Sequence, residues 1–184
     1  MNLSKSIRLY PFLITILLFG LTTTVKAQLI EDRIKEIRSM FAEVNNYHSA
    51  GKYSNCKKGS KGKEKDIDFE GKNIFLKASR CYYPMGYSKV ISYETGWEWS
   101  SNTEYYFKNG KLFFAYAIYN DICDKSEYRF YFDTNGRLIR VLEKIGNCEG
   151  NQNNKNEEVR DSKRKIELLE TINNGLRSAQ SIIL

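Results

Sequence analysis

Carboxylates and indoles lie side by side in one short segment of this sequence, Glu94-Thr95-Gly96-Trp97-Glu98-Trp99. Burial against a tryptophan raises the pKa of a carboxyl group toward the range in which it acts as a general acid. A hydrolase of glycans built here would pair Glu98 with Glu94 or Glu104 and stack a sugar on one of the two tryptophans. The alternative is a strand whose tryptophans pack in the core while its glutamates face water. We favour the second interpretation and assign no catalytic residue.

The four cysteines are the other residues that could carry chemistry, and they are Cys56, Cys81, Cys123 and Cys148. Zinc ligands usually come as close C-x-x-C pairs, whereas these cysteines are 25, 42 and 25 residues apart. We therefore predict two disulfide bridges and no metal site. Three pairings are open. Strand geometry favours Cys56 with Cys81 and Cys123 with Cys148, because the turn near Asn135 brings the last two cysteines back to the same end of a sheet.

Motifs for other chemistries do not occur in the sequence. It has no glycine-rich phosphate loop, no G-x-S-x-G elbow and no H-E-x-x-H helix, so it implies no cofactor. Its sole histidine, His48, continues an apolar series that runs through Ile30, Ile34, Ile37, Phe41 and Val44 with helical spacing. We predict a helix over this series, with His48 closing its apolar face rather than acting as a general base.

The first 27 residues have the order of a secretory signal peptide: Lys5 and Arg8, an apolar run over 12–21, and small residues around Ala27. The apolar run is shorter than the roughly 20 residues that a membrane-spanning helix needs. We therefore predict cleavage after residue 27, a secreted or periplasmic location and no stable membrane anchor. One α+β domain would remain over 28–184. Its formal charge would be +4 rather than +7, which is too low to indicate a nucleic-acid partner.

Two segments of the mature chain are predicted to lack regular structure. Residues 51–65 carry six lysines among glycines and serines, with one glutamate. We expect a solvated basic loop pinned by Cys56, although such a loop could also dock on an anionic polysaccharide or lipid headgroup. Residues 149–156 are rich in asparagine and read as a linker to a second amphipathic helix, which begins near Val159 and runs to Ile183.

Between these segments the composition is that of strands, predicted over 73–81, 88–94, 102–108, 111–119, 126–133 and 137–145. Asn109-Gly110 and Asn135-Gly136 each separate two of them, and Asn-Gly is typical of the two-residue type I′ hairpin. The predicted fold is an antiparallel meander of about five to six strands. The N-terminal and C-terminal helices are expected to pack together on one face.

Counting outward from the two turns divides the sheet into an apolar face and a Tyr/Arg face. The apolar face is expected to carry Tyr105, Phe107, Leu112, Phe114, Tyr116 and Ile118, with Phe130, Phe132, Ile139 and Val141. The other face is expected to be open. Its aromatic and arginine side chains are the types enriched where partners dock. The predicted binding residues are Tyr106, Phe113, Arg129, Tyr131 and Arg140.

The two hairpins, Tyr105-Tyr106-Phe107 with Asn109-Gly110-Lys111-Leu112 and Phe130-Tyr131-Phe132 with Asn135-Gly136-Arg137-Leu138, resemble hairpin pairs of uncharacterised secreted and lipid-anchored bacterial proteins. The resemblance covers residues 102–142. It implies a sheet and an exported context, and no catalytic residue. The chain departs from the lipid-anchored members because it lacks their lipid-bearing cysteine.

Taken together, the sequence favours a non-catalytic binding module that recognises a protein, a peptide or a glycan. A glycan hydrolase that acts through Glu98 and an inhibitor of an extracellular enzyme are the two alternatives.

Overall fold

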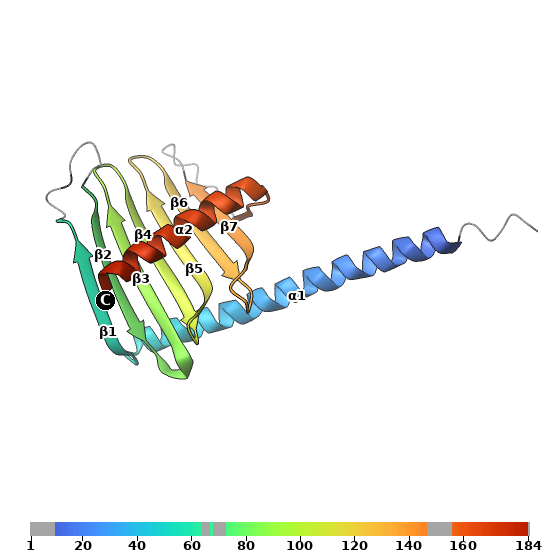
Figure 1. Ribbon diagram of the computed structural model, residues 1–184, viewed down its shortest axis with the longest axis horizontal. Coiled ribbons are helices and arrows are strands. Elements are labelled where there is room, and N and C mark those ends of the chain that lie inside the picture. The colour runs from blue at the N-terminus through green and yellow to red at the C-terminus, as the bar shows by residue number, and fades with distance from the viewer. Residues whose placement is uncertain (1–9, 64–66, 68–72, 147–155, 184) are drawn as a thin grey trace, which may run out of the picture. The chain divides into compact units, whose positions relative to one another are not determined.

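The computed structural model describes residues 10–63, 67, 73–146 and 156–183 (Figure 1). The chain divides into two compact units, Met1–Arg38 and Ser39–Leu184. The helices are α1 (Tyr10–Ser49), α2 (Ser162–Ile183) and the short 3-10 helix η2 (Pro84–Gly86). The strands within the described residues are β1 (Ser54–Lys61), β2 (Phe75–Tyr82), β3 (Tyr87–Thr95), β4 (Ser100–Lys108), β5 (Lys111–Asn120), β6 (Lys125–Phe132), β7 (Leu138–Gly146) and β8 (Glu157–Glu158).

These strands form one antiparallel sheet in which each strand pairs with the next along the chain, from β1 to β8. The predicted α+β class and the meander are confirmed. The described sheet has eight strands rather than five to six. The additional strands are β1 and β8, and β8 consists of two residues that pair with Leu142 and Glu143 of β7.

The segment predicted as a solvated basic loop contains β1, so that prediction is wrong for residues 54–61. An edge strand pairs on one side only, and exposed lysines are common there because they discourage pairing with another chain. Such a strand needs no alternation of apolar and polar residues.

Gly59 of β1 lies beneath the end of α2, where an added Cβ would be 1.8 Å from the carbonyl oxygen of Ile182.

The two helices contact opposite faces of the sheet, which corrects the prediction that both pack on one face. Tyr105 and Tyr106 are neighbours in β4, so their side chains point to opposite faces. The Tyr105 hydroxyl donates a hydrogen bond to the carbonyl oxygen of Ile172 in α2 (3.2 Å), and the Tyr106 hydroxyl lies 3.2 Å from Oδ1 of Asn45 in α1. We call the two sides the α2 face and the α1 face. Both faces carry aromatic side chains that a helix can bury.

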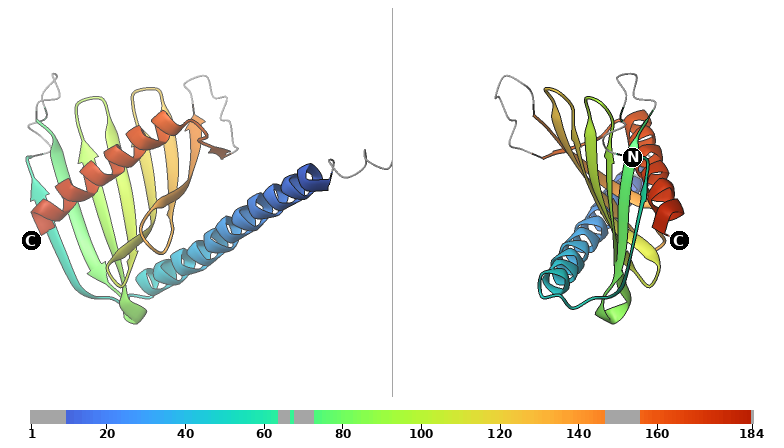
Figure 2. Two further views of the ribbon diagram at one scale, coloured as in Figure 1. Left: turned by 45° about the vertical axis from the view of Figure 1, so that its right-hand side comes forward. Right: turned by 90° about the vertical axis from the view of Figure 1, so that its left-hand side faces the viewer.

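The main core lies on the α2 face, where α2 crosses the strands obliquely (Figure 2). Alanines at 78, 115 and 117 allow the helix to come close to the sheet, and Ile172 and Ile183 of its predicted apolar series are buried. The helix begins three residues later than Val159 because Oδ1 of Asp161 accepts the backbone N–H of Arg164 (2.7 Å), as an N-cap does. The buried members of this core are Ala78, Val90, Tyr105, Phe107, Ala115, Ala117, Tyr128, Phe130, Phe132, Val141, Val159, Leu168, Ile172, Ala179 and Ile183.

The two Asn-Gly turns differ. Asn109 and Gly110 both have positive φ angles (50° and 78°), as the predicted type I′ turn requires. At the second turn only Gly136 has a positive φ (81°), and its N–H donates to the carbonyl oxygen of Asp133 (3.1 Å). That loop is a longer turn closed by a left-handed glycine. Asp133 causes the difference, since its Oδ1 accepts the backbone N–H groups of Asn135 and Arg137 (2.8 and 2.9 Å).

A bulge next to each turn reassigns residues between the faces. Tyr106 pairs with Phe114 and Phe107 with Leu112, so Phe113 is the extra residue. Beyond it, Phe114, Tyr116 and Ile118 lie on the α1 face and not on the predicted apolar face.

The second bulge changes only Leu138 and Ile139, and the residues from Arg140 onward keep their predicted faces. Tyr131 pairs with Arg140 and Phe132 with Leu138, which leaves Ile139 as the extra residue. Leu138 therefore packs against the α2-face core in the place that was predicted for Ile139.

The predicted Cys56–Cys81 bridge is confirmed, and it joins β1 to β2. Cys123 is also disulfide-bonded. Cys148, its predicted partner, lies outside the described residues, as do residues 149–155 of the predicted linker.

Candidate functional site

The five predicted binding residues do not form an exposed surface. Tyr106, Phe113 and Tyr131 are 0%, 2% and 3% exposed. The ring of Phe41, in the C-terminal part of α1, lies 5.1 Å from the rings of both Tyr106 and Phe114. An open Tyr/Arg face was therefore a wrong expectation at these three positions, because a helix covers part of that face.

The two arginines of the set are more accessible, but each already has an acidic partner in the sheet. Arg129 lies 3.8 Å from Glu127 and stacks over the Tyr116 ring. Arg140 lies 3.5 Å from Glu158 of β8. These contacts give both side chains a structural role at the β5–β8 end of the sheet.

A buried polar cluster lies where α1 meets β3 and β4. Lys89 is 4% exposed, and its Nζ contacts Oε1 of Glu104 (2.9 Å) and Oδ1 of Asn45 (3.2 Å). The Tyr106 hydroxyl donates to Glu104 at short range, and the Lys89 ammonium lies over the Tyr106 ring. A buried lysine is stable in its charged form only when it is paired and hydrogen-bonded, and here it is both.

Electrostatics keeps the phenol of this cluster neutral. Burial, followed by the charge of Glu104, raises the pKa of Tyr106 far above its ordinary value. The phenol is thus a fixed hydrogen-bond donor over the whole physiological pH range.

Glu127 of β6 has a lowered pKa. Burial raises the pKa of this carboxyl group, but the hydrogen bond from Tyr116 and the charges of Lys125 and Lys144 outweigh burial and lower it.

A pocket of about 740 Å³ opens on the β1–β4 part of the α1 face, and we call it the sheet-face pocket. Register explains its composition, because Lys77, Tyr93 and Asn102 are paired across β2, β3 and β4 and so share one face. The side chains around it combine ammonium, hydroxyl, amide and aromatic groups. Its lining consists of Lys58, Gly59, Ser60, Phe75, Lys77, Ala78, Ser79, Ile91, Tyr93 and Asn102.

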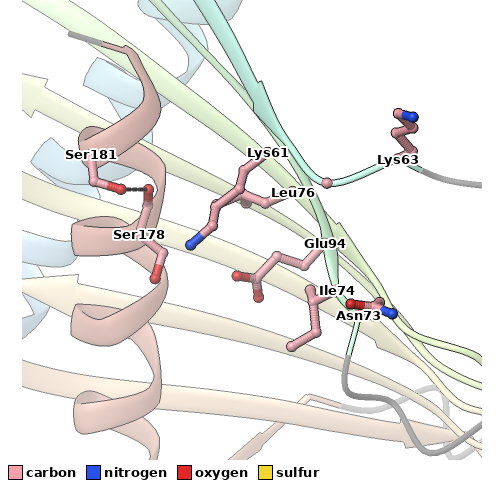
Figure 3. A pocket seen from close by; sticks show the side chains of 9 residues that line it. Lys61, Lys63, Asn73, Ile74, Leu76, Glu94, Ser178 and Ser181 are labelled. Carbon is pink, nitrogen blue, oxygen red and sulfur yellow. Dashed lines mark hydrogen bonds between the residues drawn. The ribbon is translucent and has the colours of Figure 1, made fainter. Parts of the chain in front are cut away.

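A second pocket, also of about 740 Å³, lies on the other side of the same strands, against α2 (Figure 3). We call it the α2 pocket. Lys61 and Glu94 enter it from β1 and β3, and Ser178 and Ser181 enter it from the helix. Burial raises the pKa of Glu94 above the ordinary value of a glutamate.

The carboxylates proposed for a hydrolase are not brought together. Glu94 pairs with Ser101 in β4, and Glu104 lies three positions further along that strand, so the two glutamates point to opposite faces. Glu98 lies in the loop between β3 and β4, where it is exposed. Trp97 beside it is 56% exposed, which also corrects the expectation that both tryptophans pack in the core.

The sole histidine lies in the last turn of α1, as predicted. Its Nδ1 is 2.8 Å from the Tyr83 hydroxyl, and its ring stacks on Tyr53 at 5.6 Å. These contacts fix the turn that leads from α1 into β1.

Within the described ranges no group of three or more histidine, cysteine or acidic side chains could hold a metal ion. Among the described helices, none combines the length and the apolar character needed to cross a bilayer. Comparison with protein families, curated proteins and solved structures found no match to this chain.

Proposed function

We propose that the chain is exported and acts as a non-catalytic binding module that holds an acidic glycan in the sheet-face pocket. One observation carries the proposal: the pocket joins two lysines, Lys58 and Lys77, to an aromatic side chain, Tyr93, on one sheet face. Sugar rings pack their C–H groups on aromatic side chains, while amides and hydroxyls bond to sugar hydroxyls. Lysines supply the charge that pairs with a uronic acid carboxylate.

Surrounding features support an acidic rather than a neutral ligand. The lining of the pocket contains two lysines and no acidic side chain among the described residues. The Cys56–Cys81 bridge holds β1 against β2 and keeps Lys58 near Lys77. A preorganised pocket loses less conformational entropy when it binds.

Export is supported by the residues at the N-terminus and by the disulfide. Cleavage after Ala27 would leave residues 28–49 of α1, including the part that contacts the α1 face. Intact-mass analysis of protein from the cell envelope should give a chain that begins at Gln28 and carries no free thiol. A chain that still begins at Met1, or that has four free thiols, would contradict export.

The binding test uses defined probes: tetrasaccharides of galacturonate, alginate and hyaluronan, with cellotetraose as the neutral control. At least one acidic probe should shift the backbone amide signals of Lys77, Tyr93 and Asn102 in NMR spectra. Affinity should fall as salt rises, because exposed charge pairs are screened.

Two variants and one control complete the design. Tyr93→Ala and Lys77→Gln should each weaken binding about tenfold or more, whereas Lys163→Gln, which removes one exposed charge from α2, should leave it unchanged. If no acidic probe shifts these signals, or cellotetraose binds as well as the acidic probes do, the proposal is wrong.

A further inference from the structure

The α2 pocket contains two opposite charges that do not neutralise each other. Lys61, Leu76 and Glu94 are register partners across β1, β2 and β3, so all three lie in one row on the α2 face. Strands are spaced about 4.8 Å apart, which places the backbones of Lys61 and Glu94 roughly 10 Å from each other. Leu76, which is buried, lies between them.

Their side chains point into the same space. Figure 3 shows the Lys61 ammonium and the Glu94 carboxylate both directed into the pocket, between the strands and Ser178 of α2. No ion pair within 4.0 Å joins the two groups in the described part of the chain. The Lys61 ammonium therefore has no acidic partner there.

Glu94 is the more unusual of the two groups. It is half-buried beside Leu76 and Ile74, and burial raises its pKa. A carboxylate that has lost hydration without gaining a cation is stabilised by any positive group that enters the pocket. Ser178 and Ser181 lie one helical turn apart on the opposite wall, on one side of α2.

We propose that the α2 pocket is a second binding site, which takes a small zwitterion of the amino acid or short peptide class. The ligand's ammonium group pairs with Glu94 and its carboxylate pairs with Lys61, while Leu76 and Ile74 contact the atoms between the two charges. This site is independent of the sheet-face pocket, because it lies on the other face of the sheet and selects a different charge pattern.

The first test compares three ligands of similar size in titrations followed by NMR: γ-aminobutyrate, butyrate and butylamine. Glycine and glycylglycine extend the series to an amino acid and a dipeptide. A zwitterion should shift the amide signals of Lys61, Leu76 and Glu94. Butyrate and butylamine, which carry one charge each, should bind at least about tenfold more weakly than γ-aminobutyrate.

The second test changes the protein. Glu94→Gln and Lys61→Gln should each weaken binding of the zwitterion about tenfold or more, and the double charge exchange Lys61→Glu/Glu94→Lys should restore part of the affinity. Lys77→Gln removes a charge from β2 on the other face and should have no effect, although it is expected to weaken glycan binding. Circular dichroism and the dispersion of amide signals confirm that each variant folds.

Three results would overturn the inference: no shift with any of the three zwitterions, equal binding of butyrate and γ-aminobutyrate, or undiminished binding by both single variants. Each is distinguishable from failure of the proposed function, because the glycan probes report on Lys77, Tyr93 and Asn102 instead.

Discussion

Replacement of Gly175 by alanine is expected to destabilise the protein, although alanine is the better helix former. In an exposed helix the change would add about 1 kcal/mol of stability. Here an added Cβ would lie 2.7 Å from the hydroxyl oxygen of Tyr105. Real Cβ atoms do not come that close to another heavy atom, so the phenol or the helix must move.

Neither can move freely. Tyr105 is 1% exposed in the core, and its hydroxyl donates to the carbonyl oxygen of Ile172. Overpacking a core costs about 1–3 kcal/mol, and leaving a buried hydroxyl without its acceptor costs a similar amount. These costs exceed the helix-propensity gain. The expected net loss is about 1–3 kcal/mol.

A double-mutant cycle tests this reasoning through urea unfolding followed by circular dichroism. Tyr105→Phe removes the hydroxyl that the new methyl group would meet. In that background Gly175→Ala should be neutral or stabilising by up to about 1 kcal/mol. Thr171→Ala, at an exposed position of α2, serves as the helix-propensity control, and it also removes the hydrogen bond from the Thr171 hydroxyl to the carbonyl oxygen of Glu167 (2.9 Å). Equal destabilisation by Gly175→Ala in both backgrounds would refute the proposed contact.

Three further predictions concern the sheet. Gly59→Ala should lower stability more than Gly175→Ala does, because its methyl group would meet a backbone atom, the carbonyl oxygen of Ile182. The measurement is hydrogen exchange, in which the amides of α2 should lose protection. Glu127 has a lowered pKa in the folded protein, so its stabilising contribution is present above the ordinary glutamate value and is lost as pH falls through the lowered one. Tyr116→Phe should therefore cost more stability at about pH 6.5 than at about pH 3, and an equal cost at both would contradict the assignment. Removal of the Cys56–Cys81 bridge, which closes a loop of 25 residues, by the double variant Cys56→Ser/Cys81→Ser should lower stability by about 3 kcal/mol in unfolding experiments, and an unchanged midpoint would argue against it.

Local signals in the sequence predicted the strands from β2 to β7 and their meander order correctly. Asn109-Gly110 determines its own turn, because both residues tolerate positive φ. At Asn135-Gly136 the Asp133 carboxylate binds the backbone of the turn and lengthens it. The dipeptide alone could not show this, since the decisive residue lies two positions earlier.

The error at the first bulge was small in sequence and large in space. The extra residue Phe113 moves the later side chains of β5 to the opposite face, whereas Ile139 changes only its own place and that of Leu138, and Val141 stays on the predicted face. Tyr116 thereby joins Glu127 on the α1 face instead of the apolar core. Tyr131 was assigned to the correct face, but the prediction that this face is open failed. Tyr131→Ala is thus a test of packing and would not isolate a binding role.

The two candidate pockets depend on β1, the strand that could not be predicted from the lysine-rich composition of its segment. Lys58 and Lys61 look like members of a solvated basic run when they are read along the chain. Paired with β2, they separate: Lys58 lines the sheet-face pocket, whereas Lys61 lines the α2 pocket. Because side chains alternate between the two faces of a strand, the lysines of this segment belong to two different sites. Lys58 has Tyr93 as a neighbour, and Lys61 has Glu94. The same argument predicts their independence, because a variant on one face should leave ligand affinity on the other face unchanged.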